Sequence, residues 1–193
     1  MATGDTMTFV INDTATGTTN PVVQITLTEN SDGTITFQVV QLTGAGNYLG
    51  DLRGLFFDLA DESLIGSLST ASNALVTELQ QGDDTVKDLG SGANMQGLLG
   101  DSGGYDVGVE FGTAGIGALG DDIRSVTFTL DSASRDLTLS DFASVAFGVR
   151  ITSIGQDVDG NGSIDGARNL SAKINETTFN PEFLAQDDAA VCV

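Results

Sequence analysis

One short acidic segment, residues 156–166, carries the residue types and spacing that could do chemistry in this 193-residue chain. Oxygen-bearing residues recur at every second position from Asp157, and Gly162 provides a sharp turn at the sixth position. Hard oxygen ligands at this spacing, with glycine at the turn, suit Ca2+. The sequence therefore predicts a calcium site whose ligands are Asp157, Asp159, Asn161, Ser163 through its carbonyl, and Asp165.

The segment departs from an EF-hand at its twelfth position, where Arg168 stands in place of the expected bidentate Glu. This departure argues against a helix–loop–helix sensor and favours a shorter calcium-binding loop of the kind found in dockerin-like and thrombospondin-type proteins. Asp61 or Glu62 could supply a missing ligand from another loop. An affinity of about 10⁻⁴–10⁻³ M, as in extracellular modules, is expected. The alternative is a solvated Asp/Gly turn that binds nothing.

Other charged residues allow further sites, although structural roles are the simpler interpretation. Arg53 and Arg150 fall within apolar runs, where a charge is costly unless paired, so we expect salt bridges to Asp58 or Glu110. Two acidic sets could each hold a cation or form an exposed charge cluster. These sets are Asp58, Asp61 and Glu62, and Asp83, Asp84 and Asp88.

The elements that must position the acidic segment are strands. Residues 145–154 before it form an apolar, strand-like run, and residues 170–174 after it form a short alternating run. Residues 23–28 and 34–39 alternate likewise around an Asn-Ser-Asp-Gly turn and predict a hairpin. Further strands are expected at residues 6–11, 52–59, 105–111 and 124–130, with a short one at 137–142. Residues 73–79 are expected to form either a strand or a helical turn, and residues 80–104 to be mostly loop.

Many short strands separated by Gly/Asp turns predict an all-β fold. We expect a single β-sandwich, jelly-roll-like, of about nine strands, with the calcium-binding loop between late strands. Three parts are distinguished: an N-terminal strand segment (1–12), the β-sandwich domain (13–180) and a C-terminal tail (181–193).

Composition excludes several functions. The chain has 27 acidic residues and only 7 Lys and Arg, which gives a net charge of −20. This charge disfavours binding to nucleic acid and to anionic membrane surfaces. The charge favours a calcium-containing or saline exterior, or simply keeps the protein soluble. No apolar run of about 18 residues is present, so no membrane insertion is expected. The chain has no His, which excludes a Ser-His-Asp triad and His-ligated zinc, so we do not expect an enzyme.

Residues 51–58, 105–113, 121–125 and 147–155 together resemble a poorly characterised β-sandwich domain of secreted and cell-surface bacterial proteins. Relatives of that domain often accompany RTX-type calcium-binding repeats or anchor segments. The resemblance covers roughly residues 22–174 and implies an exported, non-catalytic module, with no functional residues to carry over. The chain departs from those relatives in having no tandem Gly-Gly-x-Gly-x-Asp repeats.

The terminal segments suggest export and assembly. No signal-peptide pattern opens the chain, and residues 181–193 loosely resemble an uncleaved type I secretion signal. Residues 6–11 could pair with a neighbouring subunit, giving a homopolymer, or could complete their own sheet. Cys192, the sole cysteine, cannot form an internal disulfide.

These observations predict a secreted, calcium-stabilised structural protein, a self-assembling subunit of an extracellular fibre, biofilm matrix or surface layer of a bacterium. The alternative is a calcium-dependent adhesin or carbohydrate-binding module with a glycan partner. A glycoside hydrolase with a carboxylate pair ranks last, because Trp is absent and only two Tyr are present to stack on sugars.

Overall fold

The computed structural model describes residues 4–12, 21–71, 73–90, 92–98, 103–112 and 122–176. Within these ranges the protein is all-β, with ten strands and two short 3₁₀ turns. The strands are β1 (Thr6–Ile11), β2 (Val23–Glu29), β3 (Ile35–Gln41), β4 (Asn47–Phe57), β5 (Leu68–Thr70), β6 (Val76–Val86), β7 (Tyr105–Phe111), β8 (Ser125–Ser132), β9 (Phe147–Asp157) and β10 (Leu170–Glu176). The 3₁₀ turns are η1 (Glu62–Leu64) and η2 (Leu139–Phe142).

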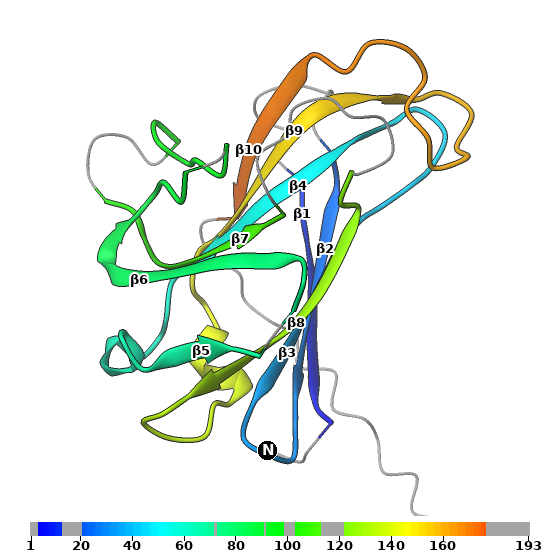
Figure 1. Cartoon of the computed structure of the whole chain (residues 1–193). Helices are drawn as coiled ribbons and strands as arrows, with labels where there is room; N and C mark the ends of the chain where they lie inside the picture. The colour runs from blue at the N-terminus through cyan, green and yellow to red at the C-terminus, as the bar shows by residue number, and fades with distance from the viewer. Residues whose placement is uncertain are drawn as a thin grey trace, which may run out of the picture.

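The strands form two antiparallel sheets of five strands each (Figure 1). The first sheet has the order β1-β2-β3-β8-β5, and the second has the order β10-β9-β4-β7-β6. Aromatic side chains from the two sheets meet between them: Phe37 stacks on Phe57 with ring centroids 5.4 Å apart, and Phe9 lies 4.8 Å from Phe147. One continuous apolar core thus joins the sheets, as in a β-sandwich.

The β2–β3 hairpin is confirmed. Along both strands every second side chain is buried, which places one face on the core and leaves the other accessible. At the turn, the Asn30 N–H donates to the Thr34 carbonyl at 2.9 Å. Gly33 takes φ +80°, a backbone conformation that side-chain-bearing residues rarely adopt.

The centre of the second sheet is covered on both faces, so β4 and β7 are buried almost throughout. Its inner face packs against the first sheet, and its outer face is covered by part of the chain that follows β6. Phe56 and Tyr105 form a small second core there with Val86, Leu89 and Met95. The prediction that residues 80–104 are mostly loop is therefore wrong in part, because β6 continues to Val86 and the residues beyond it carry apolar side chains onto the sheet.

Two other boundaries differ from the sequence prediction. β4 begins at Asn47 and not at residue 52, because its first residues pair with the end of β9. Residues 139–142 form the 3₁₀ turn η2, because Thr138 and Asp141 cap its start reciprocally, which a strand would not allow. The described strands number ten, close to the nine expected.

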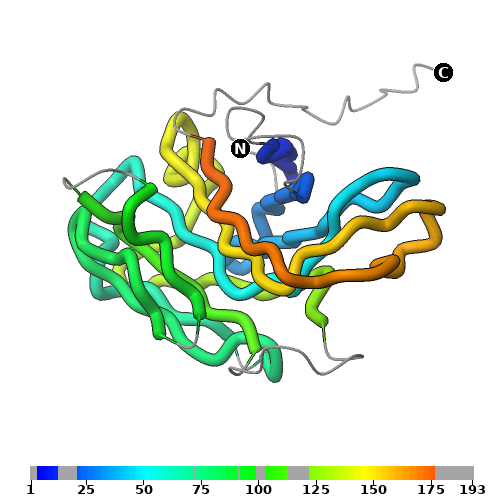
Figure 2. Tube along the Cα trace, turned by 90° about the horizontal axis from the view of Figure 1, so that it is seen from above, coloured from blue at the N-terminus to red at the C-terminus, as the bar shows by residue number. Residues whose placement is uncertain are grey.

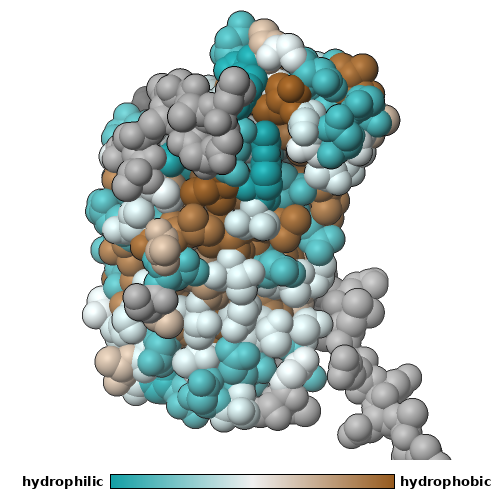
Figure 3. All heavy atoms as spheres, turned by 45° about the vertical axis from the view of Figure 1, so that its right-hand side comes forward, coloured by the Kyte–Doolittle hydropathy of each residue, from teal (hydrophilic) through white to brown (hydrophobic). Residues whose placement is uncertain are grey.

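β1 lies at an edge of the first sheet and pairs with β2 of its own chain, from Thr6 opposite Thr28 to Ile11 opposite Val23. On the face drawn in Figure 3, hydrophilic residues predominate at both ends and hydrophobic ones show between them. Exposed large hydrophobic residues in the described ranges include Val10 and Val158. None of the helical turns described has the length and apolar character needed to cross a membrane.

Candidate metal sites

The predicted calcium loop connects β9 to β10 and projects from one end of the sandwich. Figure 2 shows it beside the β3–β4 connection. The Gly46 N–H donates to the Asp157 carbonyl at 2.7 Å, and the Gln156 side chain donates to the Gly46 carbonyl at 3.2 Å. Because β9 extends to Asp157, the first predicted ligand stands on a strand end that is held by its neighbour.

Asp157 organises the loop from within. Its side chain is fully buried, and its two carboxylate oxygens accept hydrogen bonds from the N–H groups of Gly160 (2.8 Å) and Gly162 (3.0 Å). Both glycines have φ near +80°, so a side chain at either position would be strained. Carboxylate oxygens of Asp157, Asp159 and Asp165 lie within 4.8 Å of one another.

The other predicted ligands lie along the same loop. Asn161 donates its side-chain N–H to Asp159 at 2.9 Å, and its Oδ1 accepts from the Ser163 N–H at 2.8 Å. Asp165 closes the loop, since its Oδ2 accepts from the Val158 N–H at 2.9 Å. The structure thus brings all three predicted carboxylates together and keeps Asn161 and Ser163 in the adjoining turn.

The residues considered for a sixth ligand lie elsewhere. Asp61 caps η1, which follows the end of β4 opposite to the end that pairs with Asp157, and its carboxylate lies 2.8 Å from Arg135. Glu62 follows it on η1 and is exposed. Arg168, at the twelfth position, forms a salt bridge with Asp122. The structure therefore brings neither Asp61 nor Glu62 to the loop.

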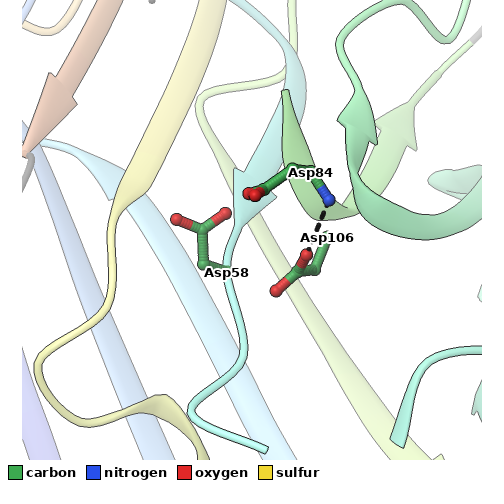
Figure 4. Close-up of side chains that lie close together, drawn as sticks. All are labelled: Asp58, Asp84 and Asp106. Atoms are coloured by element: carbon green, nitrogen blue, oxygen red, sulfur yellow. Dashed lines mark hydrogen bonds between the residues drawn. The ribbon is translucent and has the colours of Figure 1, made fainter. Parts of the chain in front are cut away.

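A second acidic cluster comes from three separate elements. Asp58 follows the end of β4, Asp84 lies in β6, and Asp106 lies near the start of β7; their carboxylate oxygens lie within 4.8 Å of one another. Figure 4 shows the carboxylates of Asp84 and Asp106 on the side facing Asp58. Asp106 is buried and accepts from the N–H groups of Asp84 (3.0 Å) and Leu59 (2.9 Å).

A β-bulge in β6 produces this cluster. Gln81 pairs with Val107 and Val86 pairs with Tyr105, so β6 has three more residues than β7 between these two pairs. Asp84 sits in this excess with φ +49° and is thereby placed over Asp106. Sequence spacing separated these residues into different sets, because neither a bulge nor a pairing between distant strands has a local signal.

The position of Asp58 in the cluster changes its pKa. Burial, followed by the negative charges of Asp106 and Asp84, raises the pKa of Asp58 to about 6. Asp58 Oδ1 is inaccessible and has no hydrogen-bond partner among the described residues. The hydroxyl of fully buried Tyr105 is also without one, and burial together with the Asp58 charge raises its pKa.

The strand arginines have structural partners. Arg53 lies 3.7 Å from Asp51 and 3.9 Å from Glu110, so the expected Glu110 pair is confirmed. Asp58 is not a partner of Arg53 in the structure. Arg150 donates to the carbonyl of Ala172 at 2.9 Å and to that of Gly92 at 3.2 Å, which ties the covering segment to the sheet.

Comparison with protein-family models, with curated proteins and with solved structures finds no match for this chain. What the described residues offer chemically is two groups of carboxylates, one in a single loop and one assembled across three elements.

Proposed function

We propose that this protein is a secreted, calcium-stabilised structural protein that assembles with copies of itself into an extracellular fibre, biofilm matrix or surface layer of a bacterium. It has no catalytic role in this proposal. Export by a type I pathway belongs to the same proposal. The resemblance of its strand motifs to domains of secreted and cell-surface bacterial proteins supports this assignment.

The observation that carries the calcium role is the arrangement around Asp157. A fully buried carboxylate lies within 4.8 Å of two others, and no salt bridge to Lys or Arg joins any of the three in the described part of the chain. Clustered carboxylates repel one another and are costly to bury without a compensating cation. Calcium would remove that repulsion and fix the β9–β10 connection.

Assembly is supported by the edge position of β1. An edge strand presents unpaired backbone groups to a neighbouring chain. The residues linking β1 to β2, 13–20, lie outside the described ranges. In an exchange, β1 would pair with β2 of another copy in the same register that it has in its own chain.

A jelly-roll-like topology is part of the proposal. β3 pairs with β8 in one sheet and β4 pairs with β7 in the other. β4, which follows β3, therefore pairs with β7, which precedes β8, so the two strand pairs are nested in the sequence as they are in a jelly roll.

Binding of a glycan ranks second. Every phenylalanine within the described ranges is buried, as is Tyr105, so these rings are committed to the two cores. Sugar-binding sites commonly use exposed aromatic rings for stacking. Because these rings are buried, we rank glycan binding below a structural role.

The calcium role is tested by the melting temperature of Asp157→Asn, measured with and without calcium. With a dissociation constant of about 10⁻⁴–10⁻³ M, 10 mM Ca2+ should stabilise the wild type by about 1.4–2.7 kcal/mol. We expect the variant to lose the share of this gain that comes from the loop. The variant also weakens a hydrogen bond to a glycine N–H, so the comparison uses the calcium-induced increment and not the absolute melting temperature.

Glu62→Gln is the control, because it removes one exposed acidic charge on η1, beyond the end of β4 that lies opposite to its pairing with Asp157. Its calcium increment should equal that of the wild type. An undiminished increment in Asp157→Asn would exclude the loop as a calcium site.

A further inference from the structure

Two buried polar atoms beside the Asp58–Asp84–Asp106 cluster have no hydrogen-bond partner among the residues that the structure describes. One is Asp58 Oδ1, and the other is the hydroxyl of Tyr105, whose residue is fully buried. Tyr105 precedes Asp106 on β7, and its ring centroid lies 5.8 Å from that of Phe56, which stands two residues before Asp58. Buried polar groups nearly always have hydrogen-bond partners, and a group left without one destabilises the fold. Their common position therefore points to a ligand that the carboxylates are arranged to receive.

The charge of the cluster points the same way. Asp106 is 3% exposed, Asp58 is partly buried and Asp84 is exposed, and none of the three carboxylates forms a salt bridge with Lys or Arg within the described ranges. An ionised carboxylate as buried as that of Asp106 is normally paired with a cation or coordinates a metal. Two backbone N–H groups bind Asp106, but they carry no full charge.

We propose that Asp58, Asp84 and Asp106 form a second site for a hard divalent cation, of which calcium is the expected member. Asp106 is oriented by the N–H groups of Leu59 and Asp84, so its carboxylate is held in place before an ion arrives. Asp58 provides the buried oxygen that lacks a partner. The site shares no residue with the 157–165 loop and can be tested without it.

The two tyrosines of the chain make the sites separable by luminescence. Tyr105 interacts with Asp58 of the cluster, whereas Tyr48 pairs with Gln156, the residue before Asp157. The chain has no other tyrosine and no Trp. Tb3+ is a luminescent substitute for Ca2+ that emits when a nearby excited tyrosine transfers energy to it. Tb3+ bound at the cluster should therefore be excited through Tyr105.

The experiment uses the full chain carrying Tyr48→Phe and Asp157→Asn, which removes both the tyrosine and the buried carboxylate of the loop. We expect Tb3+ emission to persist in this background and to be displaced by Ca2+, with Mg2+ as a parallel competitor. Asp58→Asn should weaken Tb3+ binding on the order of tenfold or more, because it removes one charged ligand. Tyr105→Phe should abolish the emission while leaving calcium binding, read by calorimetry, in place.

Asp83→Asn is the matched control, since Asp83 is exposed, precedes Asp84 on β6 and loses the same charge. When it is added to the Tyr48→Phe, Asp157→Asn protein, the Tb3+ emission should stay unchanged. Absence of emission from the folded background protein, or emission that survives Asp58→Asn, would overturn the second site. Tb3+ emission excited through Tyr48 reports on the 157–165 loop. Its loss in Asp157→Asn with Tyr48 intact bears on the proposed function and not on the second site.

Discussion

At the scale of single residues, Asp58 and Asp157 show two ways of placing a carboxylate among others. Asp157 is fully buried, but each of its oxygens accepts an N–H from a glycine of its own loop. Asp58 is less buried as a residue, yet its Oδ1 is both inaccessible and without a partner in the described structure. The loop therefore retains its shape through backbone hydrogen bonds, whereas Asp58 in the cluster is repelled by the negative charges of Asp106 and Asp84.

This repulsion should make the stability of the protein depend on pH when a chelator removes divalent ions. The pKa of Asp58 is raised to about 6 in the folded protein, above the ordinary 3.8, by burial and by Asp106 and Asp84. The folded state thus binds this proton more tightly than the unfolded state. Stability from protonated Asp58 is complete below about pH 4 and is lost as the pH rises through about 6.

The measurement is urea unfolding of the wild type and Asp58→Asn in EDTA at pH 5 and pH 7. We expect Asp58→Asn to be the more stable protein at pH 7, with its advantage shrinking at pH 5. Comparison with the variant removes the general effect of the net charge of −20, which both proteins share to within one charge. Identical pH dependence in the two proteins would mean that Asp58 is not the titrating group.

Sequence reasoning could find the residues of one cluster and not those of the other. Asp157, Asp159 and Asp165 lie within nine residues, so their spacing alone indicates a shared site. Asp58 and Asp106 are 48 positions apart and meet through pairing between β4 and β7. Asp84 joins them through a bulge, and such long-range geometry has no counterpart in local periodicity.

At the scale of elements, strands with alternating or strongly apolar patterns were predictable and polar ones were not. The β2–β3 hairpin, β7 and β8 match the alternation in the sequence. β6 reads Val-Thr-Glu-Leu-Gln-Gln-Gly-Asp-Asp-Thr-Val and is a strand because β7 supplies its hydrogen-bond partners. Tertiary pairing thus overrides weak local propensity at this sheet edge.

The edge strand β1 allows a direct test of strand exchange. Thr8 and Thr26 face each other across β1 and β2, with hydroxyl oxygens 3.0 Å apart on an exposed face. In a Cys192→Ser background, Thr8→Cys with Thr26→Cys should form a disulfide that holds β1 in its own chain. If exchange drives assembly, the oxidised protein should remain monomeric and should assemble after reduction.

Thr8→Cys alone is the control and should assemble as the parent does, read by light scattering. When the double variant is oxidised after assembly, exchange predicts disulfide-linked oligomers on a non-reducing gel. Polymers of normal yield from the oxidised monomer would exclude exchange through residues 6–11.

At the scale of the whole molecule, charge sets the conditions for assembly. Copies carrying a net charge of −20 repel one another, and bound divalent ions or salt reduce that repulsion. We expect ordered fibres or sheets in millimolar calcium and dispersed protein in EDTA, measured by light scattering and negative-stain electron microscopy.

Sodium chloride at matched ionic strength is the control for this measurement, because it screens charge without occupying a carboxylate site. Assembly in sodium chloride plus EDTA would assign the effect to screening. A monodisperse monomer under all conditions would contradict self-assembly.

Strand β4 links the two acidic clusters. Asn47, at its start, pairs with Asp157, and Asp58 follows its last residue. Over 11 residues it spans roughly 35 Å, with β9 on one side and β7 on the other. A tensile load along this strand would shear many backbone hydrogen bonds at once and not peel them one by one. With an ion bound near each end, β4 would transmit a pulling force through the subunit while both of its ends stay fixed.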